Sequence, residues 1–274
     1  MEIRKSERKK AKIKLGVQGP SGSGKTYSSL LLAYGLTNNW EKIAVIDSEN
    51  NSADLYAHLG SYNVLPLKGP FTPEKYIGAI KACVEARMEV IIIDSISHEW
   101  DGVGGVLDIH SNMTGNSFTN WAIVTPRHNH FIQTILQTDC HFICTMRSKQ
   151  DYVLSNKNGK MVPEKVGLKS VSREGTDYEF TLVLDLDCKN KATTSKDRTG
   201  LFYGKPEFTI SSETGKTILD WCNRGVTEVD IKERISKTLS LEELIGIYHQ
   251  YPEFQMSLKT DFSQRKEAFT KHGN

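Results

Sequence analysis

The residues best suited to chemistry form the segment Gly19-Pro-Ser-Gly-Ser-Gly-Lys-Thr26. It matches the spacing G-x-x-x-x-G-K-[ST] at every fixed position and lies between a predicted strand and a predicted helix. Backbone N–H groups in such a loop converge on phosphate oxygens at a helix N-terminus. The Lys25 side chain would reach the β and γ phosphates of ATP, and the Thr26 hydroxyl would bind Mg²⁺. The predicted phosphate-binding residues are Gly19, Pro20, Ser21, Gly22, Ser23, Gly24, Lys25 and Thr26.

Acidic residues end two apolar segments that follow this loop. The run at residues 90–94 ends in Asp94, and a carboxylate at a strand tip after a phosphate-binding loop can hold magnesium through water. The next residue is Ser95, where enzymes of the AAA+ type place their catalytic glutamate, so a base must come from elsewhere. The run at residues 43–47 ends in Asp47 and is followed by Glu49. These two acids can lie beside Asp94 on a neighbouring strand, or they are solvated acids at a strand end.

At these residues the chain resembles the RecA superfamily of ATPases. In that superfamily a strand after the phosphate-loop helix ends in D-x-E, whose glutamate activates the attacking water. By this resemblance Glu49 is the catalytic base, and the segment at residues 51–57 is similar as well. Thr145, at the polar end of a fourth strand, has the position of a residue that senses the γ-phosphate. A threonine there is equally explained as a good strand former.

Basic residues near the end of the predicted core have a spacing that some ATPases use in trans. Residues 195–200 contain K-x-R-x-G, which resembles the element that RecA-like hexameric helicases insert into a neighbouring subunit's nucleotide site. Lys196 or Arg198 would there neutralise charge that develops on the transferred phosphoryl group. Lys189 and Lys191 compete for this role. The alternative is a solvated basic turn.

Residues 10–225 resemble, more closely, the phage-encoded RecA-like AAA-family ATPases, a group that includes single-strand annealing proteins of phage recombination. The segments that carry this resemblance are residues 94–100, 124–128, 165–169, 173–180 and 195–200. The roles of His98, Glu99, Arg127 and His128 do not follow from it. Positions after strand ends would place these four side chains near the nucleotide or DNA side of the sheet.

The order of elements predicts an α/β fold, because apolar strands alternate with helical segments. The predicted strands are residues 13–17, 43–47, 90–94, 141–146 and 178–186. The RecA resemblance implies a mostly parallel sheet in which these strands take the order fifth, first, fourth, third, second. Residues 155–175 are expected to form a hairpin or a mobile loop, and residues 188–210 further β-structure interrupted by the polar stretch 193–200.

Three regions are expected along the chain. They are a basic N-terminal arm at residues 1–11, a RecA-like ATPase core at 12–225 and a small helical C-terminal appendage at 226–274. The expected helices of the appendage cover residues 229–239, 241–248 and 262–269, and Ser240 opens the second of them.

Composition excludes several classes of protein. The 274 residues are 38% hydrophobic and 25% charged, which is ordinary for a globular protein and rules out a mainly disordered chain. No apolar run is long enough to span a membrane. The five cysteines are odd in number and form no C-x-x-C pair, which favours a reducing cytoplasm.

Charge is unevenly distributed although the net charge is only +2. Basic stretches at residues 5–14, 157–169 and 189–205 are interleaved with aromatic residues. The aromatic residues concerned are Tyr152, Tyr178, Phe202 and Tyr203. Together with a RecA-like core, which commonly oligomerises around a strand, they favour binding of single-stranded DNA by a homo-oligomer.

The combined expectation is an Mg²⁺-dependent, RecA-like ATPase that acts on single-stranded DNA in phage recombination, repair or replication. One alternative is a nucleotide-gated adaptor, such as a helicase loader, whose C-terminal helices bind a protein partner. A phosphotransferase is the other alternative. It usually carries an arginine-rich lid, whereas the late basic elements here are hairpin-like.

Overall fold

The structure is a computed structural model that describes residues 11–157, 160–223, 225 and 227–271. Residues 1–10 of the predicted basic arm lie outside the described residues. The same holds for the side chains of residues 150–168, which include most of the second basic stretch.

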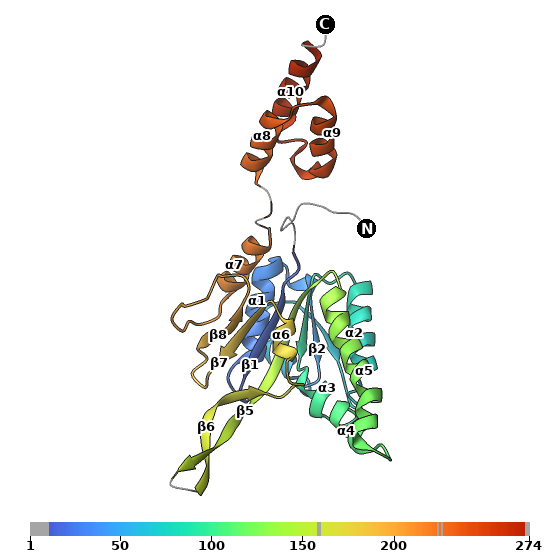
Figure 1. Ribbon diagram of the computed structural model, residues 1–274, viewed down its shortest axis with the longest axis vertical. Helices are drawn as coiled ribbons and strands as arrows, with labels where there is room; N and C mark the ends of the chain where they lie inside the picture. Colours follow the sequence, from blue (N-terminus) through green and yellow to red (C-terminus); the bar gives the residue numbers. More distant parts are fainter. Residues whose placement is uncertain (1–10, 158–159, 224, 226, 272–274) are drawn as a thin grey trace. The chain divides into compact units, whose positions relative to one another are not determined.

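The described residues of the chain form an eight-stranded sheet with helices on both faces (Figure 1). The strands are β1 (Lys14–Gly19), β2 (Ile43–Asp47), β3 (Asn63–Pro66), β4 (Val90–Asp94), β5 (His141–Lys157), β6 (Lys160–Ser170), β7 (Leu182–Leu186) and β8 (Ala192–Asp197). The α-helices are α1 (Lys25–Thr37), α2 (Pro73–Glu85), α3 (Ser97–Asp101), α4 (Val106–Ser111), α5 (Ser117–Gln137), α6 (Thr176–Glu179), α7 (Ser212–Asn223), α8 (Glu228–Lys237), α9 (Leu241–Gln250) and α10 (Lys259–Lys271). Short 3₁₀ turns are η1 (Trp40–Lys42), η2 (Ser52–Leu59) and η3 (Pro252–Phe254).

The strand order is β3-β2-β4-β5-β1-β7-β8, with β6 paired to β5 outside this path. All neighbours from β3 to β7 are parallel, whereas β8 is antiparallel to β7 and β6 is antiparallel to β5. The order of the five predicted strands is therefore confirmed, as is the mostly parallel α/β sheet. Because the strands are parallel, the carboxyl ends of β1, β2, β4 and β5 meet at one edge of the sheet.

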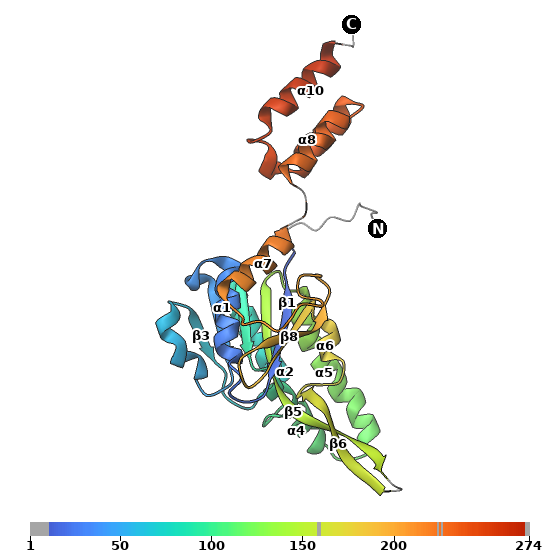
Figure 2. The ribbon, with the colours of Figure 1, turned by 90° about the vertical axis from the view of Figure 1, so that its left-hand side faces the viewer.

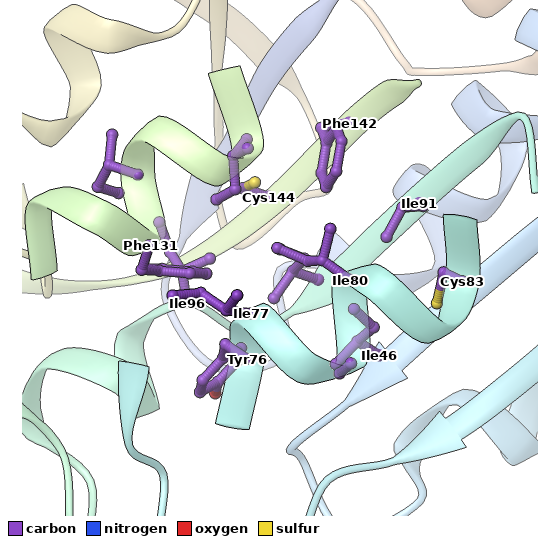
Figure 3. Close-up of a cluster of buried hydrophobic side chains, with 14 of the residues drawn as sticks. Ile46, Tyr76, Ile77, Ile80, Cys83, Ile91, Ile96, Phe131, Phe142 and Cys144 are labelled. Atoms are coloured by element: carbon purple, nitrogen blue, oxygen red, sulfur yellow. The ribbon is translucent and has the colours of Figure 1, made fainter. Parts of the chain in front are cut away.

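Both faces of the sheet are covered, so the central strands are buried on both sides. All five residues of β2 and of β4 are buried, as expected for parallel strands between helical layers. On one face, α2 and α5 pack against the sheet. Ile80 of α2 and Phe131 of α5 belong to the same buried cluster as the strand residues Ile91 and Phe142 (Figure 3). Helix α1 packs on the opposite face (Figure 2).

Helix α7 packs directly against α1, the helix that follows the phosphate-binding loop. A Cβ atom on Gly35 of α1 would overlap the Ser212 carbonyl oxygen and would lie 2.7 Å from the Lys216 nitrogen. On the α7 side, a Cβ on Gly215 would overlap the Leu32 carbonyl oxygen. The absence of side chains at both glycines therefore allows the two helices to approach this closely.

Several elements differ from the sequence predictions. Tyr178 lies in α6, so β7 begins at Leu182 and the predicted start of the fifth strand was wrong. Strand β8 runs through the polar stretch that was expected to interrupt β-structure. It is the last strand of the sheet, and an edge strand tolerates polar residues because one side is unpaired. Strand β3 and helix α7 were not predicted. The hairpin expected within residues 155–175 is formed by β5 and β6, and it begins earlier, at the pair Ser148 and Ser170.

The chain divides into two compact units. One is Lys12–Trp221, and the described residues from Cys222 onward belong to the other. In the second unit α8, α9 and α10 pack around a core of Ile231, Ile235, Leu244, Tyr251, Leu258 and Phe262. Thr227 and Asp230 form a capping box at the start of α8, and Ser240 caps α9 as predicted. Among the described helices, none has the length and apolarity needed to cross a lipid bilayer.

Alanine should have opposite effects on stability at two helical glycines, one within the contact between α1 and α7 and one outside it. Gly35→Ala should lower the free energy of unfolding by about 1–3 kcal/mol, because the new methyl group displaces α7. Gly78→Ala in the exposed face of α2, where a Cβ meets nothing within 4 Å, should raise it by roughly 0.5–1 kcal/mol. Urea unfolding of the two variants measures both changes. A neutral Gly35→Ala would contradict the tight packing.

Candidate functional site

The predicted phosphate-binding loop lies at the carboxyl edge of the sheet, between β1 and α1. Gly22 and Gly24 have φ angles of 79° and 81°, which disfavour any residue with a side chain. Gly24 is the N-cap of α1 and has no side chain to cap the helix, so the first N–H groups can receive an anion. Lys25 Nζ donates to the carbonyl oxygens of Gly19 and Pro20 at 3.0 and 2.9 Å. The ammonium group therefore lies over the loop.

Asp94 ends β4 and is 2% exposed. Its Oδ2 accepts a hydrogen bond from the Thr26 hydroxyl at 2.6 Å, and its Oδ1 accepts one from the Thr145 hydroxyl at 2.5 Å. Burial holds the pKa of this carboxyl above its ordinary value. The two threonine hydrogen bonds act to lower this pKa, whereas the charges of Glu49 and Asp47 act to raise it. A buried carboxylate beside other acids favours a cation. Thr26 and Asp94 therefore fit an Mg²⁺ ion, which prefers oxygen ligands and retains several waters.

Glu49 lies two residues beyond the end of β2, and β2 is the strand that pairs with β4. Its Oε1 accepts hydrogen bonds from Ser95 Oγ and from Arg147 Nε, both at 2.9 Å. Arg147 Nη2 donates to Oε2, which completes a two-pronged ion pair. His98 Nε2 is 4.0 Å from Oε1. Burial acts to raise the pKa of Glu49, but the hydrogen bonds from Arg147 and Ser95 outweigh it and hold this pKa below its ordinary value.

Asp47, the other acid of the predicted pair, shapes the turn that carries Glu49. Its carboxylate accepts backbone N–H groups from Glu49 at 2.7 Å and from Ala53 at 2.8 Å. The neighbouring Ser48 hydroxyl accepts the Ser95 N–H at 2.9 Å, which ties this turn to the segment after β4. Asp47 is thus used within the protein, and Glu49 is the acid that faces the loop.

A pocket of about 710 Å³ joins these elements. Its lining consists of Ser21, Gly22, Gly24, Lys25, Thr26, Glu49, Ser52, Leu55, Tyr56, Asp94, Arg147, Ser148 and Lys149. The structure therefore brings most of the predicted loop together with both predicted acids. Gly19, Pro20 and Ser23 belong to the same loop but do not line the pocket. Thr145 is fully buried behind Asp94, so its contact with the site passes through that carboxylate.

Sequence analysis missed Arg147 as a residue of this site. In the parallel pairing of β5 with β1, Arg147 is opposite Gly19, the first residue of the loop. Parallel strands have their carboxyl ends at the same edge of a sheet. Because Arg147 follows Thr145 by two positions at such a strand end, this principle could have identified Arg147 as a residue of the site. Lys149, which also lines the pocket, pairs with Asp101 at 3.4 Å.

Lys196 and Arg198 lie away from the pocket of their own chain. Lys196 is paired with Val183, which is opposite Gly16 near the middle of β1, and β8 runs from there away from the carboxyl edge. Lys196 Nζ donates to the carbonyl oxygens of Asp177, at 3.2 Å, and Tyr178. Arg198 Nη2 donates to the Tyr178 carbonyl at 3.4 Å. Both side chains therefore contact the end of α6 in this chain.

The competing basic residues Lys189 and Lys191 flank the turn between β7 and β8. The side-chain nitrogen of Asn190 in this turn lies 2.8 Å from the position that a Cβ on Gly24 would occupy. The turn is thus adjacent to the phosphate-binding loop of the same chain. Lys191 Nζ donates to the Thr209 hydroxyl at 2.9 Å.

The four residues without an assigned role occupy different places. His98 contacts the Ser48 hydroxyl through Nδ1 at 2.9 Å and lies near Glu49. Arg127 and His128 were expected after the end of a strand, and this expectation was wrong. Both lie within α5, because the helix continues through Pro126.

Their partners indicate structural roles for three of these residues. Arg127 forms an ion pair on the outer surface with Glu74, at 2.7 Å. His128 Nδ1 contacts Glu99 Oε2 at 3.0 Å, and both side chains are buried.

Comparison with known proteins agrees with this geometry. A model of the family described as AAA domain matches residues 11–219. The chain belongs to the AAA domain family. No curated protein matches the sequence. The AAA domain covers β1 through most of α7, and thus all elements that line the pocket. Membership supports a P-loop ATPase core and suggests nucleotide binding and hydrolysis.

The two neighbours in α5 should respond differently to substitution in this AAA domain. His128→Ala leaves the carboxyl of Glu99 buried without its partner, so the free energy of unfolding should fall by about 3 kcal/mol. Arg127→Ala removes a half-exposed ion pair and should cost under about 1 kcal/mol. Chemical unfolding monitored by circular dichroism tests both. Equal effects would contradict the distinction between a buried pair and a surface pair.

Proposed function

We propose that the AAA domain binds ATP with Mg²⁺, hydrolyses the γ-phosphate bond and acts in this way on single-stranded DNA during phage recombination, repair or replication. The observation that carries this proposal is the meeting of Lys25, Thr26, Asp94 and Glu49 around one pocket, from a loop and two neighbouring strands. This arrangement combines phosphate binding, a place for a metal and a candidate base.

Each residue has a role that follows from its place. The loop N–H groups and Lys25 bind the phosphates, and Lys25 exchanges its present carbonyl partners for phosphate oxygens. Thr26 and Asp94 hold the Mg²⁺ ion, which when bound neutralises phosphate charge. Glu49 orients the attacking water and accepts its proton. Thr145 fixes the orientation of Asp94 through its hydrogen bond.

The long hairpin of β5 and β6 supports DNA as the partner. It begins one residue after Arg147 and extends beyond the sheet (Figure 1). The sequence of its two strands is rich in lysine. The lysines are Lys149, Lys157, Lys160, Lys165 and Lys169. Positive charge on an extended hairpin suits a phosphate backbone, and the hairpin's origin at the pocket gives DNA a route to influence hydrolysis.

The positions of Lys196 and Arg198 support a homo-oligomer in which one of them acts in trans. A cation that lies away from the pocket of its own chain can contact a bound nucleotide directly only in a neighbouring subunit's site. The present contacts with the end of α6 place both cations together on the surface, near Tyr178, which is 69% exposed.

A second candidate function, a nucleotide-gated adaptor, is favoured by the C-terminal unit. Helices α9 and α10 border a groove of about 620 Å³. Its apolar lining includes Ile245, Tyr248 and Met256, which are 48%, 40% and 89% exposed. Exposed apolar surface of this kind marks protein–protein contacts. An adaptor would bind ATP with negligible turnover.

Two substitutions should separate nucleotide binding from hydrolysis. Lys25→Ala should weaken ATP binding roughly 10- to 100-fold, because it removes a charge-assisted contact with phosphate. Glu49→Gln should retain binding but lower kcat by about 10²- to 10⁴-fold, because a base acts only on the attacking water. Binding is measured by calorimetry, and phosphate release is measured with and without single-stranded DNA.

The outcomes separate the candidate functions. Wild-type turnover that rises with single-stranded DNA supports the proposal, whereas tight ATP binding with negligible turnover in both conditions favours the adaptor. Normal turnover by Glu49→Gln would show that Glu49 is not the base. Normal ATP binding by Lys25→Ala would place the nucleotide elsewhere.

A mixing experiment tests the action in trans. Arg198→Ala subunits have an intact Glu49, and Glu49→Gln subunits have an intact Arg198, so mixed oligomers contain some complete interfaces. Activity should rise above the sum of the two preparations, because a trans cation contributes about 10³- to 10⁵-fold where it is established. The same mixture with Lys196→Ala identifies which cation acts. Co-assembly without recovery in either mixture would exclude both residues.

A further inference from the structure

Arg147 has a place in the pocket that the proposed hydrolysis does not yet use. Its guanidinium group binds both carboxylate oxygens of Glu49, the candidate base. Ser95 Oγ donates to one of the same oxygens at 2.9 Å. These three donors occupy three of the roughly four lone-pair sites of the carboxylate, and the guanidinium charge disfavours proton uptake at the remaining site. In this arrangement Glu49 is held in place and is a weaker proton acceptor than a free carboxylate.

The same guanidinium group can reach a ligand. Arg147 lines the pocket together with Lys25, and its side chain is 46% exposed against 22% for Glu49. A guanidinium group binds phosphate in the same two-pronged manner as carboxylate. A bound polyphosphate and the Glu49 carboxylate are therefore alternative partners for one cation in one pocket.

The backbone of Arg147 is anchored while its side chain is free to change partner. Its N–H donates to the Ser97 hydroxyl at 2.9 Å, and its carbonyl oxygen accepts the Val171 N–H at 2.7 Å. A change of partner therefore requires rotation of the side chain alone, with no rearrangement of β5.

We propose that Arg147 is a positioning residue with two alternative partners: it binds Glu49 when the pocket is empty or holds ADP, and it moves to the terminal phosphate of ATP, which releases Glu49 to the attacking water. This inference rests on the proposed function of the pocket. It makes the candidate base available only when the bond to be broken is present. It also makes Arg147 a determinant of the preference for ATP over ADP.

Competition for one cation has a measurable signature. Since ATP must displace Glu49 from Arg147, removing the Glu49 charge should tighten binding of a non-hydrolysable β,γ-imido analogue of ATP. Glu49→Gln should do this several-fold in a chain that retains Arg147, with little change for ADP. In the Arg147→Ala background the same substitution should give no gain, because there is no cation to release.

The experiment is a double-mutant cycle on the full chain, with Mg²⁺ present. Calorimetry measures the affinities of wild type, Glu49→Gln, Arg147→Ala and the double variant for the imido analogue and for ADP. Arg147→Ala alone should weaken the analogue roughly 10- to 100-fold, the effect of one charge-assisted contact, and ADP less than about threefold. Arg147→Lys, which keeps the charge but not the fork, should fall between wild type and Arg147→Ala and replaces it if that variant does not fold.

Two outcomes would overturn the proposal. An equal gain from Glu49→Gln in both backgrounds would show simple relief of charge repulsion rather than competition for Arg147. Equal losses for the analogue and ADP in the Arg147 variants would show that Arg147 does not contact the terminal phosphate.

Failure of the proposed function would give a different pattern of nucleotide affinities. Lys25→Ala serves as the reference variant, because Lys25 contacts the loop and not Glu49. If Lys25→Ala binds both nucleotides like wild type, the pocket is not the nucleotide site. If it loses both while the Arg147 variants discriminate against neither, only the role of Arg147 fails.

Discussion

The carboxylate of Asp94 is buried at the tip of β4, and two threonine hydroxyl groups are its hydrogen-bond partners there. An ionised carboxylate in such a place costs several kcal/mol unless its oxygens are satisfied. Thr26 comes from the first turn of α1 and Thr145 from β5, so meeting this requirement holds three separate elements within hydrogen-bond distance. The phosphate-binding loop thereby acquires a fixed position relative to the strand tips.

The neighbouring acids show how one sheet edge keeps several carboxylates distinct. Asp47 is hydrogen-bonded by backbone N–H groups, and Glu49 is paired with a guanidinium group. In the described part of the chain, the side-chain oxygens of Asp94 accept hydrogen bonds from two threonine hydroxyl groups. The environments therefore separate a structural acid, a candidate base and a candidate metal ligand, although the sequence presents all of them as acids at the ends of apolar strands.

Local patterns predicted the elements that depend on local interactions. Apolar runs mark β2 and β4 without ambiguity, and the loop at Gly19–Thr26 is contiguous in sequence, so both follow from residue types alone. The ion pair of Glu49 with Arg147 joins residues 98 positions apart and depends on the register of parallel strands. No local pattern encodes that register. Strand β8 lies within residues 188–210, where further β-structure was expected, but its polar residues were interpreted as an interruption because a polar edge strand has the composition of a loop.

Lys196 has partners within its own chain. The spacing of its motif pointed to a neighbouring subunit, and the described contacts of Lys196 are with the carbonyl groups of its own α6. A cation that pairs with backbone oxygen can change partner at modest cost. The present contacts of Lys196 are therefore compatible with a role in a neighbouring subunit's site.

Strand β5 continues from the central sheet into the hairpin as one strand, from His141 to Lys157. The ten residues from Ser148 to Lys157 extend for roughly 33 Å at about 3.3 Å per residue. No loop separates the hairpin part of this strand from the pocket, although a β-bulge shifts the pairing at Asp151 and Tyr152. By the same geometry, a tilt of about 5° at Arg147 displaces the tip by roughly 3 Å, close to the length of one hydrogen bond. A change in strand direction at Arg147 would therefore displace the hairpin tip much further than the pocket.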